Sequence, residues 1–406
     1  MKLNDIAEFV TDKISSGSIS LDRYVTTDSL LQNRRGRETA QNLPPMPCAL
    51  THYRQGDVLV ANIRPYLKKV WYADSEGGCS SDVLVFRAKN GHCSSFLYTV
   101  LMQDAFFDYA MSGAKGSKMP RGDKDQIMRY ELPTLTPMEE ENIGNMMVDI
   151  MSKINVNRQI NDNLEAIAKQ LYDYWFVQFD FPNEEGKPYK SSGGAMVWNE
   201  KLKREIPQGL GTPKIGDIEK NIITGKTPSC ADEDNFGGDI PFVTIDDIRG
   251  NLFVFEAQRT LSTKGADSQE KKYLPIGSLS VSCIGTIGVM GFVARLAQTN
   301  QQINSIVFEH EYNKEFLYFS LKLYYENAKA KTGNVFANMS KEEFASIIVA
   351  YPPKQILQAF HNKVAPIFDS IKNNIEEINS LTKQRDELLP LLMNSQAMVN
   401  YHLSDD

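Results

Sequence analysis

The sequence predicts an α+β protein built from two α/β domains with twisted, mostly antiparallel sheets, separated by two long helices that pack as an antiparallel coiled coil. Three observations predict this fold class. The chain repeats itself from end to end, short β-branched runs fill the first part of each repeat, and a long amphipathic helix closes each repeat. The 406 residues allow two to three domains, and an apolar fraction of 42% can form substantial cores.

The repeat is visible as four pairs of similar segments that occur in the same order. Three pairs are "KLNDIAE" at Lys2 with "KIGDIEK" at Lys214, "GDVLVANI" at Gly56 with "GSLSVSCI" at Gly277, and "FLYTVLMQDAFFDYA" at Phe96 with "FLYFSLKLYYENAKA" at Phe316. In the fourth pair, "LPTLTPMEEENI" and "VAYPPKQILQAF" each lead into a long helical run. The offset stays between roughly 212 and 221 residues, so the chain is a tandem duplication.

Each copy begins with a globular domain, which we expect at residues 1–136 and 214–352. Short runs such as "DVLVANI", "DVLVFRA" and "SLSVSCI" are broken by Gly, Pro and Asn, which is typical of short strands in a twisted antiparallel sheet. One amphipathic helix, near 95–111 in the first copy and near 315–330 in the second, closes each domain. The polar segment 181–213 is interpreted as an exposed linker, and 396–406 as a tail.

A long helix follows each domain, at 137–180 and at 353–395. The first helix begins at Pro137 with an acidic run, so negative charge meets the positive end of the helix dipole. Apolar residues recur along the two helices as a seam: Ile150, Ile154, Ile160, Leu164, Ile167 and Leu171 in the first, and Ile367, Ile371, Ile378, Leu381, Leu388 and Leu392 in the second. Because neither helix has another long seam to pair with, we expect them to pack against each other.

Composition and charge exclude several classes of protein. The net charge of −7 and a pI near 5.5 count against a nucleic-acid binder, although local patches or partner subunits can supply a positive field. The N-terminus lacks the apolar run of a signal peptide, and the longest apolar stretch, "IGTIGVMGFVA", is too short to cross a membrane. The five cysteines show no C-x-x-C spacing, so we expect a reduced, cytoplasmic protein without a membrane partner.

The segment "ITGKTPS", from Ile223, ends like a phosphate-binding P-loop but lacks the first half of that motif. A P-loop needs a glycine five residues before Gly225, and that position is Lys220. Pro228 has no N–H group and opposes the helix that follows a P-loop. The sequence therefore does not predict a nucleotide site here.

Other catalytic and metal-binding patterns are weak or missing. The sequence has no G-x-S-x-G and no H-E-x-x-H, and Cys79 with the His-Cys pair at 92–93 is weaker than any zinc pattern. Asp173, Glu185 and Lys187 have nuclease-like residue types but fall at a helix end and in the linker, whereas a nuclease site needs adjoining strands. The segment "YPPK" lacks two of the residues that an amino-methyltransferase tetrapeptide needs. We therefore expect no catalytic residue and no metal ligand in this chain.

Five segments together form a recognisable set: "ITGKTPS" with "GDIPFVTIDDI", "SCIGTIGVMGFV", "TNQQINSIVF", "LEAIAKQLYDYWFVQFDFP" and "GKPYKSSGGAMVW". With them, the chain resembles the specificity subunits of Type I restriction–modification systems over nearly its whole length. The first domain departs most from this pattern, because "NIRPYLKKVWYA" stands where the second domain has a glycine-rich pair.

The resemblance implies a non-catalytic DNA-recognition subunit in which each globular domain is a target recognition domain for half of a split double-stranded DNA site. The two helices, the central and C-terminal conserved regions of the family, would form a spacer and dock two adenine-N6 methyltransferase subunits. Restriction subunits would join for ATP-dependent cleavage. S-adenosylmethionine, ATP and magnesium would be bound by those partners, so the resemblance implies no cofactor in this chain. It also implies that "ITGKTPS" is a loop at the entry of a recognition domain.

Basic loops supply the candidates for DNA contact, because lysine and arginine meet phosphates and guanine edges. The first domain offers two such loops, "LLQNRRGRE" and "SGAKGSKMPRGDK", and the second offers "KAKTGNVFANMSK" and the "GKT" of the entry loop. The candidates are Arg34, Arg35, Arg37, Lys115, Lys118, Arg121, Lys226, Thr227, Lys329, Lys331 and Asn334. The alternative interpretation of "LLQNRRGRE" is a solvated charge cluster.

Two other functions compete with DNA recognition by a non-catalytic subunit. The globular domains could belong to a nuclease or methyltransferase with its own activity, which binding of S-adenosylmethionine or cleavage with magnesium alone would indicate. The chain could also be a coiled-coil scaffold with no role at DNA, which its acidic net charge favours.

Overall fold

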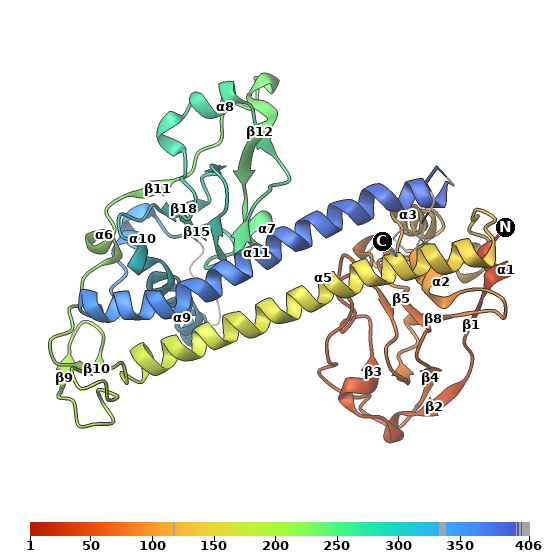
Figure 1. The fold of residues 1–406 in the computed structure, drawn as a ribbon, viewed down its shortest axis with the longest axis horizontal. Coiled ribbons are helices and arrows are strands. Elements are labelled where there is room, and N and C mark those ends of the chain that lie inside the picture. The colour runs from red at the N-terminus through yellow and green to blue at the C-terminus, as the bar shows by residue number, and fades with distance from the viewer. Residues whose placement is uncertain (117, 333–337, 395, 398, 400–406) are drawn as a thin grey trace, which may run out of the picture. The chain divides into compact units, whose positions relative to one another are not determined.

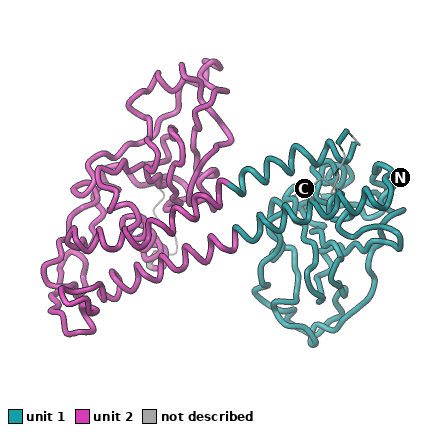
Figure 2. Tube along the Cα trace, viewed as in Figure 1, with its two compact units in different colours: residues 1–157, 377–406 teal, residues 158–376 magenta. Residues whose placement is uncertain are grey.

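The computed structural model describes residues 1–406 except 117, 333–337, 395, 398 and 400–406, and the side chains of residues 331 and 332 also lie outside the description. The chain divides into two compact units, shown in Figure 2. Unit 1 comprises residues 1–157 and 377–406, and unit 2 comprises residues 158–376. Each of the two long helices contributes one segment to each unit.

Unit 1 contains two four-stranded sheets with the strand orders β1-β8-β5-β6 and β2-β4-β7-β3 (Figure 1). Its strands are β1 (Ala7–Phe9), β2 (Lys13–Ser15), β3 (Tyr24–Val25), β4 (Ala49–Tyr53), β5 (Val58–Ala61), β6 (Val70–Tyr72), β7 (Gly77–Cys79) and β8 (Val83–Ala88). Its short helices are α1 (Leu3–Ile6), α2 (Ser94–Leu101), α3 (Asp104–Ser112) and α4 (Lys124–Ile127). Neighbouring strands are antiparallel except β3 and β7, which are parallel.

Unit 2 contains a five-stranded sheet, β11-β18-β15-β16-β13, a three-stranded sheet, β14-β12-β17, and the hairpin β9-β10. Its strands are β9 (Met196–Asn199), β10 (Arg204–Pro207), β11 (Ile222–Thr224), β12 (Phe236–Val243), β13 (Phe253–Val254), β14 (Thr260–Leu261), β15 (Leu279–Ser282), β16 (Met290–Val293), β17 (Gln298–Thr299) and β18 (Ile303–Ile306). Its helices are α6 (Ile215–Ile218), α7 (Ile245–Ile248), α8 (Thr263–Asp267), α9 (Lys314–Thr332) and α10 (Lys341–Ala345). The segment interpreted as a linker thus contains a β-hairpin.

The strand order of the main sheets confirms the tandem duplication. The order β1-β8-β5-β6 in unit 1 matches β11-β18-β15-β16 in unit 2, strand for strand, and all of these pairs are antiparallel. Helices α2 and α3 follow the sheet in unit 1, as α9 does in unit 2. The single helix expected near 95–111 is therefore two helices, which meet at Met102 and Gln103.

The long helices are α5 (Pro137–Tyr172) and α11 (Lys354–Met393). Thr136 caps α5, because its hydroxyl accepts the Glu139 N–H at 3.3 Å while the Glu139 carboxylate accepts the Thr136 N–H at 2.7 Å. A single π-helical turn, Asp173–Val177, ends this helix. The start predicted from the proline and the acidic run is confirmed, and so are the approximate ends of both helices.

The two long helices run antiparallel to each other in both units. In unit 1, Arg385 contacts the sulfur of Met151 at 3.5 Å, and Asn157 donates a hydrogen bond of 2.7 Å to Glu377. In unit 2, Asn374 donates to Asn161 at 2.8 Å. Residue numbers therefore increase along α5 in the direction in which they decrease along α11, so the helices are antiparallel, as the sequence predicted.

The buried seam of α5 differs from the predicted one at two positions. Ile154 is fully buried, but Ile160 and Ile167 are 41% and 53% exposed. The step from residue 154 to residue 160 explains this difference, because six residues at about 100° each turn the helix about 120° away from the original face. The following step of seven residues keeps Ile167 on the same exposed side as Ile160. Ala168 and Tyr172 are buried on α5 instead.

Candidate DNA interface

The predicted arginine loop of unit 1 contains one buried, one half-buried and one exposed arginine. Arg34 is 8% exposed, and its guanidinium donates to the carbonyl of Met102 and pairs with Asp104. It therefore joins this loop to the break between α2 and α3, a structural role rather than a surface one. Arg37 donates to the carbonyl of Asp22 at 2.6 Å and stacks on a tryptophan ring.

Arg35 differs from its two neighbours because its side chain is exposed. Within the described part of the chain, no carboxylate lies within ion-pair distance of Arg35, whereas Arg34 has Asp104. Of the three predicted arginines, Arg35 is thus the one that is both exposed and without a partner among the described residues.

The second predicted loop of unit 1 is also partly neutralised. Lys115 pairs with Asp123 at 3.2 Å, and Arg121 pairs with Asp82 at 2.5 Å. Lys118 is exposed, and the described residues place no carboxylate within ion-pair distance of it. Lys118 therefore joins Arg35 as a cation available for DNA.

A third loop, residues 62–68, lies between these two predicted loops, and sequence reasoning did not select it. On one side, the Asn33 N–H donates to Leu67 and the Arg34 N–H to Lys68, at 3.0 and 2.9 Å. On the other side, the Arg64 N–H donates to the carbonyl of Pro120 at 2.7 Å. Backbone hydrogen bonds thus join three basic segments, 33–37, 62–68 and 115–121, into one surface, which we call the unit 1 loop face.

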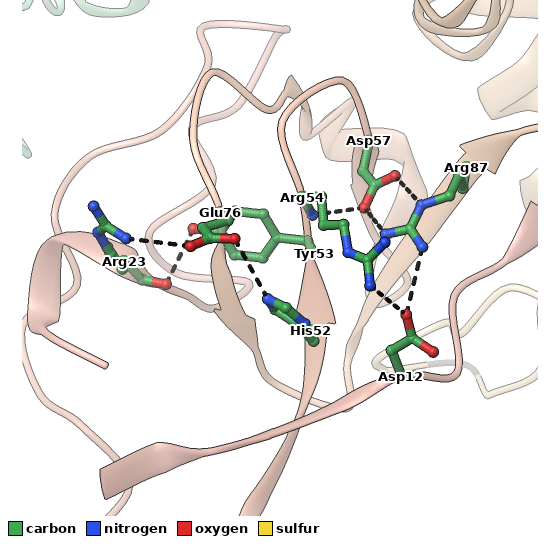
Figure 3. Close-up of polar contacts among 8 residues, drawn as sticks. All are labelled: Asp12, Arg23, His52, Tyr53, Arg54, Asp57, Glu76 and Arg87. Carbon is green, nitrogen blue, oxygen red and sulfur yellow. Dashed lines mark hydrogen bonds and ion pairs between the residues drawn. The ribbon is translucent and has the colours of Figure 1, made fainter. Parts of the chain in front are cut away.

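A different charge cluster in unit 1, drawn in Figure 3, is internally neutralised. Arg87 donates two hydrogen bonds of 2.8 and 2.7 Å to the buried carboxylate of Asp57, and these bonds raise the pKa of Arg87 above its already high value. Asp12 lies 3.3 Å from Arg54 and 3.5 Å from Arg87. Because its arginines and carboxylates satisfy each other, this cluster stabilises the fold and is not a candidate for DNA contact.

The "ITGKTPS" loop of unit 2 is tied to a neighbouring turn. Its Gly225 is buried, and an added Cβ would lie 2.1 Å from the carbonyl oxygen of Asn300. The Lys226 N–H donates to Thr299 at 2.9 Å, and the Thr227 hydroxyl donates to Gln301 at 2.8 Å. The backbone N–H of Lys226 and the hydroxyl of Thr227, two groups that a P-loop would direct at its ligand, are thus occupied within the protein, while the Lys226 side chain stays exposed.

Unit 2 repeats the loop pairing seen in unit 1. The hairpin loop between β15 and β16 pairs with the segment after α9 through Ile284 and Asn338, and the Met339 N–H donates to Cys283 at 2.8 Å. Lys329 is exposed near the end of α9. Of the other two candidates on this segment, Asn334 and the side chain of Lys331 lie outside the described residues.

The residues considered for catalysis have structural partners. His92 lies 3.0 Å from the buried carboxylate of Glu140, Asp173 pairs with Lys169, and Lys187 pairs with Glu185. No group of three or more His, Cys, Asp or Glu side chains that could hold a metal ion occurs among the described residues. In the same part of the chain, no helix is both long enough and apolar enough to cross a membrane.

Comparisons with known proteins show what this chain is similar to. Residues 207–385 match the family model described as the Type I restriction modification DNA specificity domain. The chain is 27% identical to the Type I restriction enzyme HindI specificity subunit of Haemophilus influenzae, over 97% of this chain and 98% of that protein. It is 24% identical to the MjaIX specificity subunit of Methanocaldococcus jannaschii, over 88% of this chain and 82% of the relative.

A solved structure supports the fold. The crystal structure of the Type I restriction–modification system S subunit from M. genitalium aligns with a TM-score of 0.59 and 13% identity, over 97% of this chain and 95% of that one. The duplicated domains and the matched domain model define a protein that recognises DNA sequence. Over most of its length the chain is similar to specificity subunits of Type I restriction enzymes.

Proposed function

We propose that this subunit reads a bipartite double-stranded DNA site, with one half read by unit 1 and the other by unit 2. One observation carries the proposal: in both units the main hairpin loop is bonded to the segment that follows the domain helix. Exposed lysines lie on or next to that segment, Lys118 in unit 1 and Lys329 in unit 2. Equivalent loops that carry cations in both copies fit two equivalent contacts with a phosphate backbone.

The long helices act as the spacer between half-sites and as the docking surface for two adenine-N6 methyltransferase subunits. The exposed apolar side chains of Ile160 and Ile167 on α5 support docking, because their burial against a partner would be favourable. Restriction subunits complete the assembly. In this proposal S-adenosylmethionine, ATP and magnesium bind to those partners, in the cytoplasm, and this chain holds no cofactor.

A binding assay with and without the methyltransferase tests the proposal. Because the chain carries a net charge of −7, we expect weak DNA binding by the isolated subunit and tight, sequence-specific binding with the partner. Gel shifts at one stated salt concentration measure both. Equal affinity with and without the partner, or no preference for one sequence by the complex, contradicts the proposal.

The spacer is tested by inserting seven residues into each long helix, which preserves the heptad phase of the seam. At 1.5 Å per residue the insertion lengthens the helices by about 10 Å, or up to about three base pairs of DNA. Mapping methylated adenines in cells that express the variant with its methyltransferase should show the same half-sites with a longer gap. Because three base pairs also rotate the DNA by about 100°, loss of methylation is compatible with the proposal. An active variant with an unchanged gap contradicts it.

A further inference from the structure

Two residues of the unit 1 hairpin loop have a backbone conformation that usually belongs to glycine. Arg64 has φ 53° and Lys68 has φ 51°, both in the left-handed region. In unit 2, Gly285 and Gly288 have φ 77° and 84° at the ends of the corresponding loop. Arg64 and Gly285 are separated by the same 221 positions as Gly56 and Gly277, so they are equivalent in the repeat. Both loops have two positions with positive φ, but only unit 1 has side chains there.

The Lys68 side chain has a structural partner, whereas the Arg64 side chain has none among the described residues. Lys68 lies 2.6 Å from Asp104, which also binds Arg34. Arg64 is exposed, and the structure places no described carboxylate within ion-pair distance of it. Glycine would adopt this backbone with less strain. The fold therefore does not explain an arginine at position 64.

The backbone at Arg64 is held in place on both sides. Its N–H donates to the carbonyl of Pro120 at 2.7 Å, and its own carbonyl accepts the Leu67 N–H at 2.9 Å. The next residue, Pro65, is buried and has a fixed φ. The loop therefore presents the start of the Arg64 side chain in a defined direction. A phosphate contact needs only a positive charge nearby, but hydrogen bonding to a base edge depends on direction.

The surroundings of Arg64 fit a DNA surface. Arg35 and Lys118, which like Arg64 are exposed and have no described carboxylate within ion-pair distance, lie on the two segments to which this loop is bonded. Tyr66 and Met119 are 50% and 53% exposed. The segments around Arg64 thus carry cations that suit phosphates and exposed apolar side chains that suit base edges. Arg64 itself has a backbone that is held in place by hydrogen bonds.

We propose that Arg64 is a base-reading residue of unit 1, whose guanidinium donates hydrogen bonds to a base edge in the DNA major groove. Guanine is the base that fits, because its O6 and N7 atoms accept the two parallel N–H groups of arginine. Arg35 and Lys118 contact the flanking phosphates. This inference rests on the proposed function, since it assigns a specific role within the half-site read by unit 1.

Three variants test the inference in the full chain assembled with its methyltransferase. Arg64→Gly removes the side chain and suits the left-handed backbone, and Arg64→Asn removes the charge with a residue that tolerates this backbone. Arg64→Lys keeps the charge and loses the planar fork. The control is Lys203→Gly, which removes an exposed lysine of unit 2 with φ 52°. It makes the same change of charge and backbone outside the unit 1 loop face.

The measurements are affinity for the wild-type recognition duplex, its salt dependence, affinity for duplexes with each base pair substituted, and the melting temperature. We expect Arg64→Gly and Arg64→Asn to bind about ten- to a hundredfold more weakly, with an unchanged or higher melting temperature for Arg64→Gly. We expect Arg64→Lys to keep the salt dependence but to lose discrimination at one or two adjoining positions of one half-site. Lys203→Gly should bind like the wild type.

The outcomes distinguish failure of the base-reading role of Arg64 from failure of the proposed function. If Arg64→Gly binds and discriminates like the wild type, or if Lys203→Gly loses as much affinity, the inference is wrong while the proposed function stands. Full discrimination by Arg64→Lys makes Arg64 a phosphate contact and overturns base reading. A melting temperature that falls in both Arg64→Gly and Arg64→Asn makes the side chain structural. If the wild-type complex does not discriminate between sequences, the proposed function itself fails.

Discussion

The hairpin loops of the two units each have two positions with positive φ, but different residues occupy them. Unit 2 places Gly285 and Gly288 at the left-handed positions, which is the least strained choice. Unit 1 places Arg64 and Lys68 there, at a cost of roughly 1–2 kcal/mol for each left-handed residue. The two copies thus share the strand order of their main sheets, whereas the side chains on their hairpin loops differ. Under the proposed function, this difference would let the two units read different half-sites.

The cores of the two units also differ. In unit 2, Phe360 of α11 packs against Phe176 at 5.0 Å and Trp175 at 5.8 Å between ring centroids. In unit 1, the corresponding end of α11 contributes aliphatic residues, Leu389 and Leu392, to a core that contains Phe106. Because Phe360 packs into this aromatic cluster, its truncation tests whether unit 2 can lose stability while unit 1 keeps it.

The largest expected effect follows from Phe360→Ala. Phe360 is fully buried, so its truncation should lower the free energy of unfolding of unit 2 by about 3–5 kcal/mol. Hydrogen exchange resolved along the chain measures both units in one experiment, and Phe106→Ala is the matched change in unit 1. If Phe360→Ala lowered protection equally in both units, they would form one cooperative body and the comparison between them would fail.

The next effect distinguishes the two loop glycines of unit 2. An added Cβ at Gly288 would lie 2.7 Å from the ring of Tyr325, whereas none of the described atoms comes within 4 Å of one at Gly285. Gly285→Ala should therefore cost about 1–2 kcal/mol for the left-handed backbone alone. Gly288→Ala should cost about 2–4 kcal/mol, because crowding adds to the same strain. Urea unfolding of both variants measures the difference, and equal losses would contradict the steric argument.

A smaller effect is expected from Lys329→Ala combined with Lys331→Ala, the unit 2 counterpart of the cations on the unit 1 loop face. If both lysines contact phosphates, affinity should fall for all sequences, and the slope of log affinity against log salt should decrease in magnitude by about 1–2. Fluorescence anisotropy over a range of salt concentrations measures both quantities. Lys201→Ala with Lys203→Ala removes the same charge from the β9-β10 hairpin and should leave the slope unchanged. An unchanged slope in the first variant would place that segment away from DNA.

The smallest effect concerns pH and the histidine of unit 2. His361 on α11 lies 2.7 Å from the buried carboxylate of Glu315, and this hydrogen bond raises the pKa of His361. Because the folded state binds the proton more tightly, this stabilisation is complete below the unfolded pKa of about 6.5 and is lost as pH rises through the higher folded pKa. The melting temperature of unit 2 should therefore decrease as pH rises above about 6.5, and Glu315→Gln should reduce that dependence. A dependence of the same size in Glu315→Gln would assign it to other groups.

Much of the fold could be predicted because it depends on local or repeated patterns. The repeated segments predicted two copies, and the shared order of the four main strands confirms them. Pro137 and the acidic run predicted the start of α5, because caps and dipoles act within one helical turn. The candidate DNA surface could be predicted only in part: the sequence identified the loops of Arg35 and Lys118, but it missed the loop of Arg64 that lies between them.

The sequence by itself determined the duplication, most of the strands, the two long helices and the resemblance to Type I specificity subunits. Only the tertiary structure decided that Arg34 is buried against Asp104 and that Arg64 has a left-handed backbone. The physical reason is the range of the interactions. Periodicity and caps are set by neighbours within a few residues, whereas the burial of a charge and the strain of a loop depend on contacts with residues that are distant in sequence.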